Sequence, residues 1–138
     1  MPDATLRDHA ATFRRFNRLY TRFIGTVTDR FLRTPYSLAE GRVLYELATR
    51  DKPRAKDIAE ALGMDAGYLS RVLTKHERAG LLKRKTSKTD SRAADLLLTP
   101  KGRAVFRVLN QRSEKQARDV LTRMPAPTRT RFIEAIST

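Results

Sequence analysis

The chain has 138 residues, which is long enough for one domain with a hydrophobic core and short for most enzymes. Its 29 Lys and Arg outnumber its 15 Asp and Glu, and the formal net charge of +14 indicates a polyanionic partner, for which we expect nucleic acid. The absence of cysteine excludes disulfides, thiol redox sensing and thiolate metal sites.

The sequence also argues against a membrane role. Its longest apolar runs are a few residues, far below the ~20 that span a bilayer. The chain opens with the polar stretch "MPDATLRDHA" rather than with an apolar signal segment. We therefore expect a cytoplasmic protein with no membrane partner.

The N-terminal region, roughly 5–32, is predicted to form one long helix. One apolar stripe at heptad-like spacing consists of Leu6, Ala10, Phe13, Tyr20, Ile24, Val27 and Phe31, and an adjacent stripe of Phe16, Leu19 and Phe23. A helix with so wide an apolar arc needs cover on two sides. A second subunit would provide one side; the alternative is an ordinary core helix in a monomer.

Two breaks and a capping signal mark the next helix. Pro35 interrupts the chain, and Ser37 with Glu40 has the spacing of a capping box. Leu44, Leu47 and Ala48 then supply a modest apolar face, and a polar loop containing Pro53 follows.

Residues 55–79 are predicted to form two helices that meet at Gly63. Gly63 ends the first helix in a left-handed conformation, Met64 acts as a hydrophobic staple, and Asp65 caps the second helix. Ala59 allows the two helices to cross closely, and Leu69 and Val72 fill the space between them. Leu73 also faces inward, and Gly80 ends the second helix. This spacing is typical of a helix-turn-helix.

The outward face of the second helix has the character of a DNA-reading surface. It carries Ala66, Gly67, Tyr68, Ser70, Arg71, Thr74 and Lys75. Arg71 suits a guanine edge in the major groove, and Ser70 and Thr74 suit phosphate or base contacts. An ordinary solvated helix face is the alternative.

A basic hairpin is predicted directly behind that helix. "LLKRKTS" and "AADLLLT" read as two strands joined by "KTDSR". From Arg71 to Arg92 there are eight Lys and Arg against Glu77 and Asp90, a net of 8 − 2 = +6. We expect this hairpin to be too short and too charged at its tip to be core. It is predicted to be a wing, with Arg92 at the minor groove and basic groups on phosphates. Lys56, Lys88 and Asp90 complete the predicted DNA-binding set.

After the hairpin, Thr99 caps and Pro100 begins a helix that is predicted to reach about Met124. The segment "PAP" at 125–127 breaks it, and a short last helix offers Phe132, Ile133 and Ile136. So long a helix suits packing between subunits.

Signals of catalysis are missing from the sequence. It has two histidines and no Gly-rich nucleotide loop, HExxH or GxSxG motif, and its carboxylates are scattered singly. We expect no enzyme activity, no cofactor and no metal, and we expect His76 to be exposed or partly packed.

The stretch "DAGYLSRVLTKHERAGLLKRKTSKTDSRAADLLLTPKGRAVF" resembles the winged-helix core of the MarR family of bacterial transcription regulators. Asp90, Arg92, Leu98, Thr99 and Gly102 match that family's pattern. The resemblance implies a mainly α fold with a small β-hairpin wing. Residues 1–138 would form one domain, with a winged helix-turn-helix at 34–98 between dimerisation helices at 1–33 and 99–138.

The same resemblance implies partners and residue roles. Family members are homodimers, so the expected target is a palindromic double-stranded operator. The resemblance places Arg92 at the wing tip. It implies that Asp90 tethers the wing through an ion pair, for which we suggest Arg71 as the partner. Many members respond to small anionic or phenolic effectors. Aromatic side chains of the first helix with a nearby basic one offer such a pocket, although they also suit a plain core: Phe16, Tyr20, Phe23 and Arg15.

We therefore expect a homodimeric, sequence-specific, ligand-responsive regulator, most simply a repressor. One alternative is a basic architectural or RNA-associated protein that binds phosphate without reading sequence. Another follows from "FRRFNRLYTRFIG", "YSLAEGRVLYELA" and "MDAGYLSRVL", which are similar to regulators fused to a GNAT-type acetyltransferase. This chain contains no glycine-rich pyrophosphate loop, so it would be the DNA-binding part of such a fusion.

Overall fold

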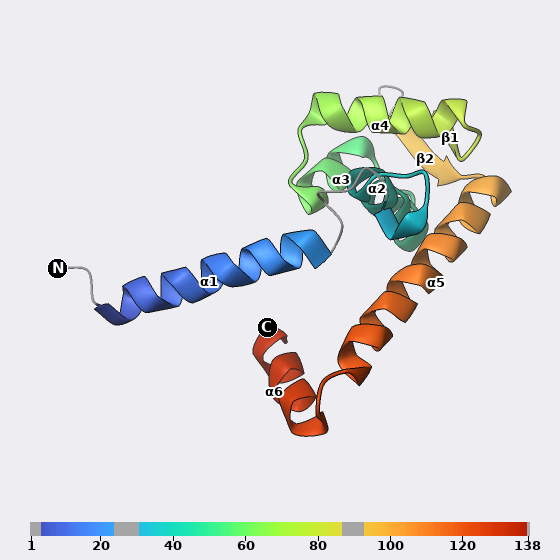
Figure 1. Ribbon diagram of the computed structural model, residues 1–138. Coiled ribbons are helices and arrows are strands. Elements are labelled where there is room, and N and C mark those ends of the chain that lie inside the picture. The colour runs from blue at the N-terminus through green and yellow to red at the C-terminus, as the bar shows by residue number, and fades with distance from the viewer. Residues whose placement is uncertain (1–3, 24–30, 87–92, 138) are drawn as a thin grey trace.

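The computed structural model describes residues 4–23, 31–86 and 93–137. In chain order the elements are α1 (Ala4–Phe23), the 3-10 turn η1 (Phe31–Arg33), α2 (Leu38–Thr49), α3 (Ala55–Leu62), α4 (Ala66–Arg78), β1 (Leu82–Thr86), β2 (Ala94–Leu98), α5 (Pro100–Thr122) and α6 (Ala126–Ile136). Helices α2, α3 and α4 and the hairpin form a compact body, from which α1 and α5 extend as two arms (Figure 1). The predicted fold class, mainly α with a β-hairpin wing, is confirmed.

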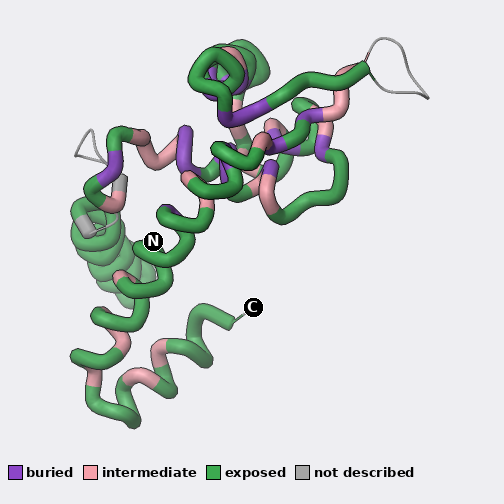
Figure 2. The backbone as a smooth tube through the Cα atoms, turned by 90° about the vertical axis from the view of Figure 1, so that its right-hand side faces the viewer, coloured by how far each residue is buried: buried purple, intermediate pink, exposed green. Residues whose placement is uncertain are grey.

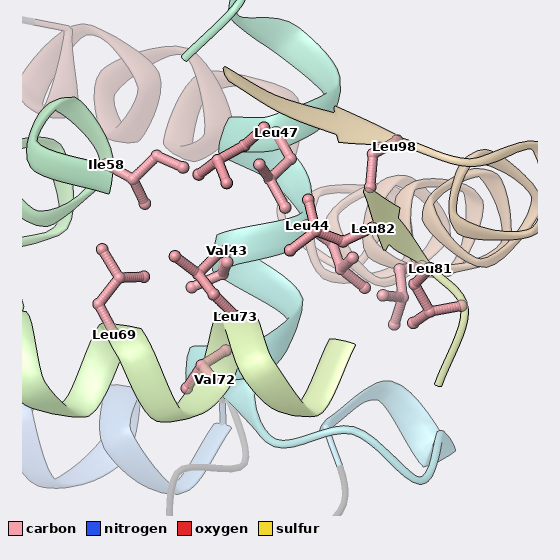
Figure 3. Close-up of a cluster of buried hydrophobic side chains, with 12 residues drawn as sticks. Val43, Leu44, Leu47, Ile58, Leu69, Val72, Leu73, Leu81, Leu82 and Leu98 are labelled. Atoms are coloured by element: carbon pink, nitrogen blue, oxygen red, sulfur yellow. The ribbon is translucent and has the colours of Figure 1, made fainter. Parts of the chain in front are cut away.

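The core lies where α2, α3, α4 and the base of the hairpin meet. Figure 3 shows the side chains of α4 pointing toward α2 and α3. The buried apolar residues are Val43, Leu44, Leu47, Ile58, Leu69, Val72, Leu73, Leu81, Leu82, Leu96, Leu98 and Leu109. Each such side chain contributes about 1.5–3 kcal/mol when it leaves water. This cluster therefore fixes the position of α4 in the body.

The base of the hairpin belongs to this core, so the expectation that the hairpin is too short and charged to be core is wrong for its base. The strands are antiparallel, with Leu82 opposite Leu98. Alternate residues of a strand point to opposite faces, so Leu82, Leu96 and Leu98 are buried while Lys83 and Leu97 face outward.

The helix-turn-helix corner has the predicted local chemistry. Gly63 adopts φ 58° and ψ 36° and ends α3 in the left-handed region, where only glycine avoids a steric cost. Asp65 caps α4 by accepting a hydrogen bond from the Tyr68 N–H at 3.0 Å. Met64 and Ala59 are half-buried against the core.

Only half of the predicted capping box forms at α2. The Ser37 Oγ accepts a hydrogen bond from the Glu40 N–H at 3.1 Å. The Glu40 carboxylate accepts a hydrogen bond from Lys75 on α4 in place of one from the Ser37 N–H. The sequence signal therefore located the helix start but not the partner of Glu40.

The first predicted helix is confirmed over Ala4–Phe23, and the next residues of its predicted range, 24–30, lie outside the described part of the chain. At the predicted C-terminal end the backbone is not α-helical, since Leu32 and Arg33 have φ 53° and 57°. Arg112 of α5 donates hydrogen bonds from Nη1 to the carbonyls of Leu32 and Arg33 at 3.2 and 3.1 Å. These bonds hold the turn against α5.

The described side chains of α1 are exposed in the single chain, as the green tube in Figure 2 shows. Phe13 is 64% exposed and Leu19 is 69% exposed. The alternative of a core helix in a monomer is therefore wrong for 4–22. On α6, Ile133 and Ile136 are exposed as well. The apolar faces of α1 and α6 are without cover among the described residues.

The start of α5 packs tightly against the chain that follows α4. Thr99 caps α5 by accepting a hydrogen bond from the Gly102 N–H at 3.0 Å, and its hydroxyl donates to the Gly80 carbonyl at 2.6 Å. A Cβ atom at Gly102 would lie 2.1 Å from the Leu81 carbonyl oxygen. Only glycine fits there, because backbone cannot move aside as a flexible side chain can.

Replacing Gly102 by alanine is therefore expected to destabilise the fold. We predict that Gly102→Ala lowers the free energy of unfolding by about 2–3 kcal/mol through this overpacking, as measured by urea denaturation. Gly67→Ala is the matched control, since the nearest atom to its added Cβ is the Asp65 Oδ2 of a movable side chain at 3.1 Å. Equal stabilities for the two variants would contradict the prediction.

Candidate nucleic-acid interface

The outward side of α4 is polar and open. Tyr68, Ser70 and Arg71 are exposed and Thr74 is half-buried. Ser70, Arg71, Thr74, Lys75 and Arg78 line a surface hollow. Their spacing of one and four residues places them along one side of the helix, opposite the buried Leu69, Val72 and Leu73. Of the predicted contact residues on α4, Ser70, Arg71, Thr74 and Lys75 line this hollow together, while Ala66, Gly67 and Tyr68 are exposed in the first turn of the helix.

The N-terminal end of α4 arranges the Arg71 side chain. The guanidinium carbon of Arg71 lies 5.7 Å from the centroid of the Tyr68 ring. Its Nη1 lies 3.9 Å from the position of a Cβ at Gly67. A guanidinium over an aromatic face gains a cation–π interaction of about 0.5–1 kcal/mol at exposed sites. Arg71 is therefore held along the N-terminal half of α4, the part of a recognition helix that reaches base edges.

The first strand of the hairpin extends the basic surface. Lys83, Arg84 and Lys85 are exposed, and the Arg84 Nε lies 2.6 Å from the Glu77 Oε2. That ion pair joins β1 to α4. Over 66–78 and 82–86 six Lys and Arg face one acidic residue, a net of 6 − 1 = +5 with histidine neutral, which favours phosphate as the ligand of this surface.

The predicted wing tip lies outside the described residues. Lys88, Asp90 and Arg92 fall in 87–92, so their roles remain predictions, as does the suggested pairing of Asp90 with Arg71. Lys56 is described: it lies on α3 with an exposed side chain, and its Nζ is 4.0 Å from the Glu60 Oε1.

Sequence reasoning missed the role of Glu40. The Lys75 Nζ lies 3.1 Å from the Glu40 Oε1, and the Glu40 side chain is 11% exposed. The other carboxylate oxygen, Oε2, is buried and accepts no hydrogen bond. The capping-box pattern accounted for Glu40 through its neighbour Ser37. No sequence signal connects Glu40 with Lys75, which lies 35 positions away along the chain.

The expectation that His76 is exposed or partly packed is wrong. His76 is 1% exposed. Its Nε2 lies 3.1 Å from the Glu40 carbonyl oxygen, and the Tyr36 ring packs at a tilt with a centroid distance of 6.2 Å. Burial lowers the pKa of His76 because it disfavours the charged ring, while the hydrogen bond to Glu40 opposes the shift.

The predicted effector residues lie on the exposed face of α1. The rings of Phe16 and Tyr20 stack with their centroids 5.5 Å apart, and each side chain is 45% exposed. Arg15 donates a hydrogen bond to the Thr12 hydroxyl at 3.2 Å. The side chain of Phe23 lies outside the described residues. The described residues thus form an aromatic pair rather than an enclosed pocket.

The helix-turn-helix with its adjoining hairpin defines a winged helix-turn-helix protein. Residues 36–94, which include α2, α3, α4 and β1, match the MarR family. No curated protein sequence matches the chain. Among the described residues, no helix has the length and apolar character needed to cross a membrane.

Solved structures confirm the fold at low sequence identity. Staphylococcus aureus MepR in a DNA complex gives a TM-score of 0.71 at 17% identity, covering 93% of this chain and 93% of that one. Bordetella bronchiseptica BpsR, whose DNA binding is regulated by 6-hydroxynicotinic acid, gives 0.73 at 18% identity and covers 91% and 96%. The Streptomyces coelicolor regulator PcaV with its natural ligand gives 0.68 at 22% identity and covers 99% and 94%.

The MarR part of the family resemblance is supported, and the acetyltransferase part is not. The chain has the fold of MarR family transcription regulators, and the segment that forms its helix-turn-helix matches that family. The narrower similarity to acetyltransferase fusions has no support in these matches, whose names mention no acetyltransferase.

The buried His76 is expected to make stability depend on pH. An unfolded histidine titrates near about pH 6.5, and burial lowers the pKa of His76 in the folded state. Below about pH 6.5 the unfolded chain therefore binds more protons than the folded chain. The stabilisation is complete above this pH and is lost as the pH falls.

We predict that the free energy of unfolding falls more steeply between about pH 7 and 5 in the wild type than in His76→Gln. Glutamine retains an N–H that can reach the Glu40 carbonyl but does not titrate. Urea denaturation at a series of pH values measures both curves. Parallel curves would show that His76 does not cause the dependence.

Proposed function

We propose that this protein is a homodimeric, sequence-specific DNA-binding transcription regulator, and that it acts in the cytoplasm as a ligand-responsive repressor. The observation that carries the proposal is the outward side of α4. Within the described structure it is uncovered, polar and basic, and it lies beside a basic β-hairpin on a fold shared with a protein solved on DNA.

The geometry of α4 supports a division of roles. Arg71 lies along the N-terminal half of the helix, where a guanidinium can donate two hydrogen bonds to the O6 and N7 of a guanine. Ser70 and Thr74 carry hydroxyl groups on the same side of the helix, and these groups suit phosphate or base-edge contacts. Lys83 and Lys85 are exposed on β1 and suit the backbone of the flanking duplex. Arg92, which the sequence predicts for the tip of the hairpin, is proposed for the minor groove.

The homodimer is supported by the uncovered apolar face of α1. Leu6, Phe13 and Leu19 are each more than 60% exposed, at 62%, 64% and 69%. A soluble monomer rarely leaves so extended an apolar surface in water. In a two-fold dimer held by α1 and the arms at 99–138, two α4 helices would reach half-sites about one helical turn apart on a palindromic operator.

An effector site on α1 is the third part of the proposal. The stacked Phe16 and Tyr20 offer aromatic faces, and Arg15 on the same helix offers a positive charge. This combination of groups suits a small anionic or phenolic ligand. The second subunit would complete the binding site. BpsR, whose DNA binding is regulated by a small molecule, and PcaV, solved with its natural ligand, support a ligand-responsive function on this fold.

One alternative function follows from charge alone. A net charge of +14 would allow the chain to bind phosphate without reading sequence, as an architectural or RNA-associated protein does. The match of residues 36–94 to the MarR family favours the regulator. We propose no catalytic role.

The role of Arg71 can be tested on a duplex that the wild type selects from a randomised pool. We predict that Arg71→Ala costs about 1–3 kcal/mol on that duplex and relaxes base preference at one position of each half-site. Arg107→Ala is the control, because Arg107 is exposed on α5 and its loss changes the net charge equally. Both are measured by competition anisotropy at about 150 mM salt.

Two results would overturn this proposal. If the wild type selects no consensus, the architectural alternative holds. If Arg71→Ala and Arg107→Ala weaken binding equally on every sequence, Arg71 does not read a base.

The dimer can be tested on α1. Phe13→Asp places a charge on the apolar face and is expected to shift the protein from dimer to monomer in sedimentation velocity. Ala11→Asp adds the same charge at an exposed position on the opposite side of the helix and is expected to leave the dimer intact. A wild type that sediments as a monomer at micromolar concentration would contradict the proposed assembly.

A further inference from the structure

Lys75 belongs to the outward side of α4, yet its ammonium group already has a partner. The Lys75 Nζ lies 3.1 Å from the Glu40 Oε1 of α2. The two side chains differ in environment, since that of Lys75 is 64% exposed and that of Glu40 is 11% exposed. The pair therefore reaches from the surface that would meet DNA into the body of the domain.

The Glu40 carboxylate has strong reasons to retain this partner. It is largely removed from water, and among the described residues only Lys75 donates a hydrogen bond to it, because Oε2 accepts none. Glu40 lies in the first turn of α2, where the helix dipole favours a negative charge. A Lys75 that moved to a DNA phosphate would leave a buried carboxylate uncompensated, which is strongly unfavourable.

The same residue holds α4 at a second atom. The carbonyl oxygen of Glu40 lies 3.1 Å from the Nε2 of His76, the residue that follows Lys75. Consecutive residues of α4 are thus bound by one residue of α2, one through a side chain and one through the backbone. This double contact ties the C-terminal half of α4 to the start of α2.

We propose that Glu40 is a positioning residue of the recognition helix, which holds Lys75 away from DNA phosphates. The inference rests on the proposed DNA-binding function and refines it, because it removes Lys75 from the set of phosphate contacts. A count of the exposed basic groups on α4 then exceeds by one the number of phosphates that α4 neutralises in each subunit.

The slope of log affinity against log salt concentration measures this number. Each neutralised phosphate contributes about −0.9 to the slope on duplex DNA. Glu40→Gln keeps the shape of the side chain and removes its charge, so Lys75 becomes free to reach a phosphate. We expect the slope to steepen by about 0.9 for each Lys75 released, with tighter binding at low salt.

A matched control separates this effect from a change in net charge. Glu114 pairs with Arg118 on α5 at 2.6 Å with both side chains exposed. Glu114→Gln removes the same charge from an exposed pair and is expected to leave the slope unchanged. Equal slopes for Glu40→Gln and Glu114→Gln would overturn the inference.

Substitution of Lys75 gives an independent result. Lys75→Met in the wild-type background is expected to leave the salt slope unchanged, because Lys75 contacts no phosphate while Glu40 holds it. In the Glu40→Gln background the same substitution should return the steeper slope to the wild-type value. If Lys75→Met alone makes the slope shallower by about 0.9 per subunit, Lys75 is a direct phosphate contact and the inference is wrong. This variant decides the question even where Glu40→Gln fails to fold.

The two proposals fail in different ways. A wild type that binds no duplex overturns the DNA-binding function and the inference with it. If the wild type binds duplex DNA and Glu40→Gln leaves the slope of log affinity against log salt concentration unaltered, only the role of Glu40 is overturned.

Discussion

The burial of one side of α4 is the constraint on which the rest of the structure depends. Leu69 and Leu73 are each 1% exposed, and they pack against α2, α3 and the base of the hairpin. With these side chains packed inward, the polar opposite side of the helix faces solvent. The same apolar contacts that stabilise the fold thus orient Ser70, Arg71 and Thr74 outward.

Polar contacts then fix α4 to its neighbours at several points along its length. Asp65 caps its start, Glu40 binds Lys75 and His76 in its second half, and Arg84 pairs with Glu77. Beyond its end, the Thr99 hydroxyl binds the Gly80 carbonyl and brings in α5. A helix held in this way keeps one orientation relative to the hairpin, which a surface that reads a duplex requires.

Local features were predicted well from the sequence because they depend on neighbouring residues. The left-handed Gly63, the cap at Asp65, the cap at Thr99 with Pro100 and the buried side of α4 all follow from spacings of a few residues. The end of α1 was predicted wrongly, since the apolar repeat continues through Phe31 while the backbone at Leu32 is left-handed. There Arg112, 80 residues away, binds the turn and outweighs the periodicity.

The sequence by itself determined the order of the helices, the corner at Gly63, the basic character of the hairpin and the outward residues of α4. Only the tertiary structure decided that Glu40 takes Lys75 from the surface, that His76 is buried and that the hairpin base completes the core. The physical reason is distance along the chain: Lys75 and His76 lie 35 and 36 positions from Glu40. Capping and periodicity act within a few residues, whereas these partners meet only when separate elements pack around a shared core.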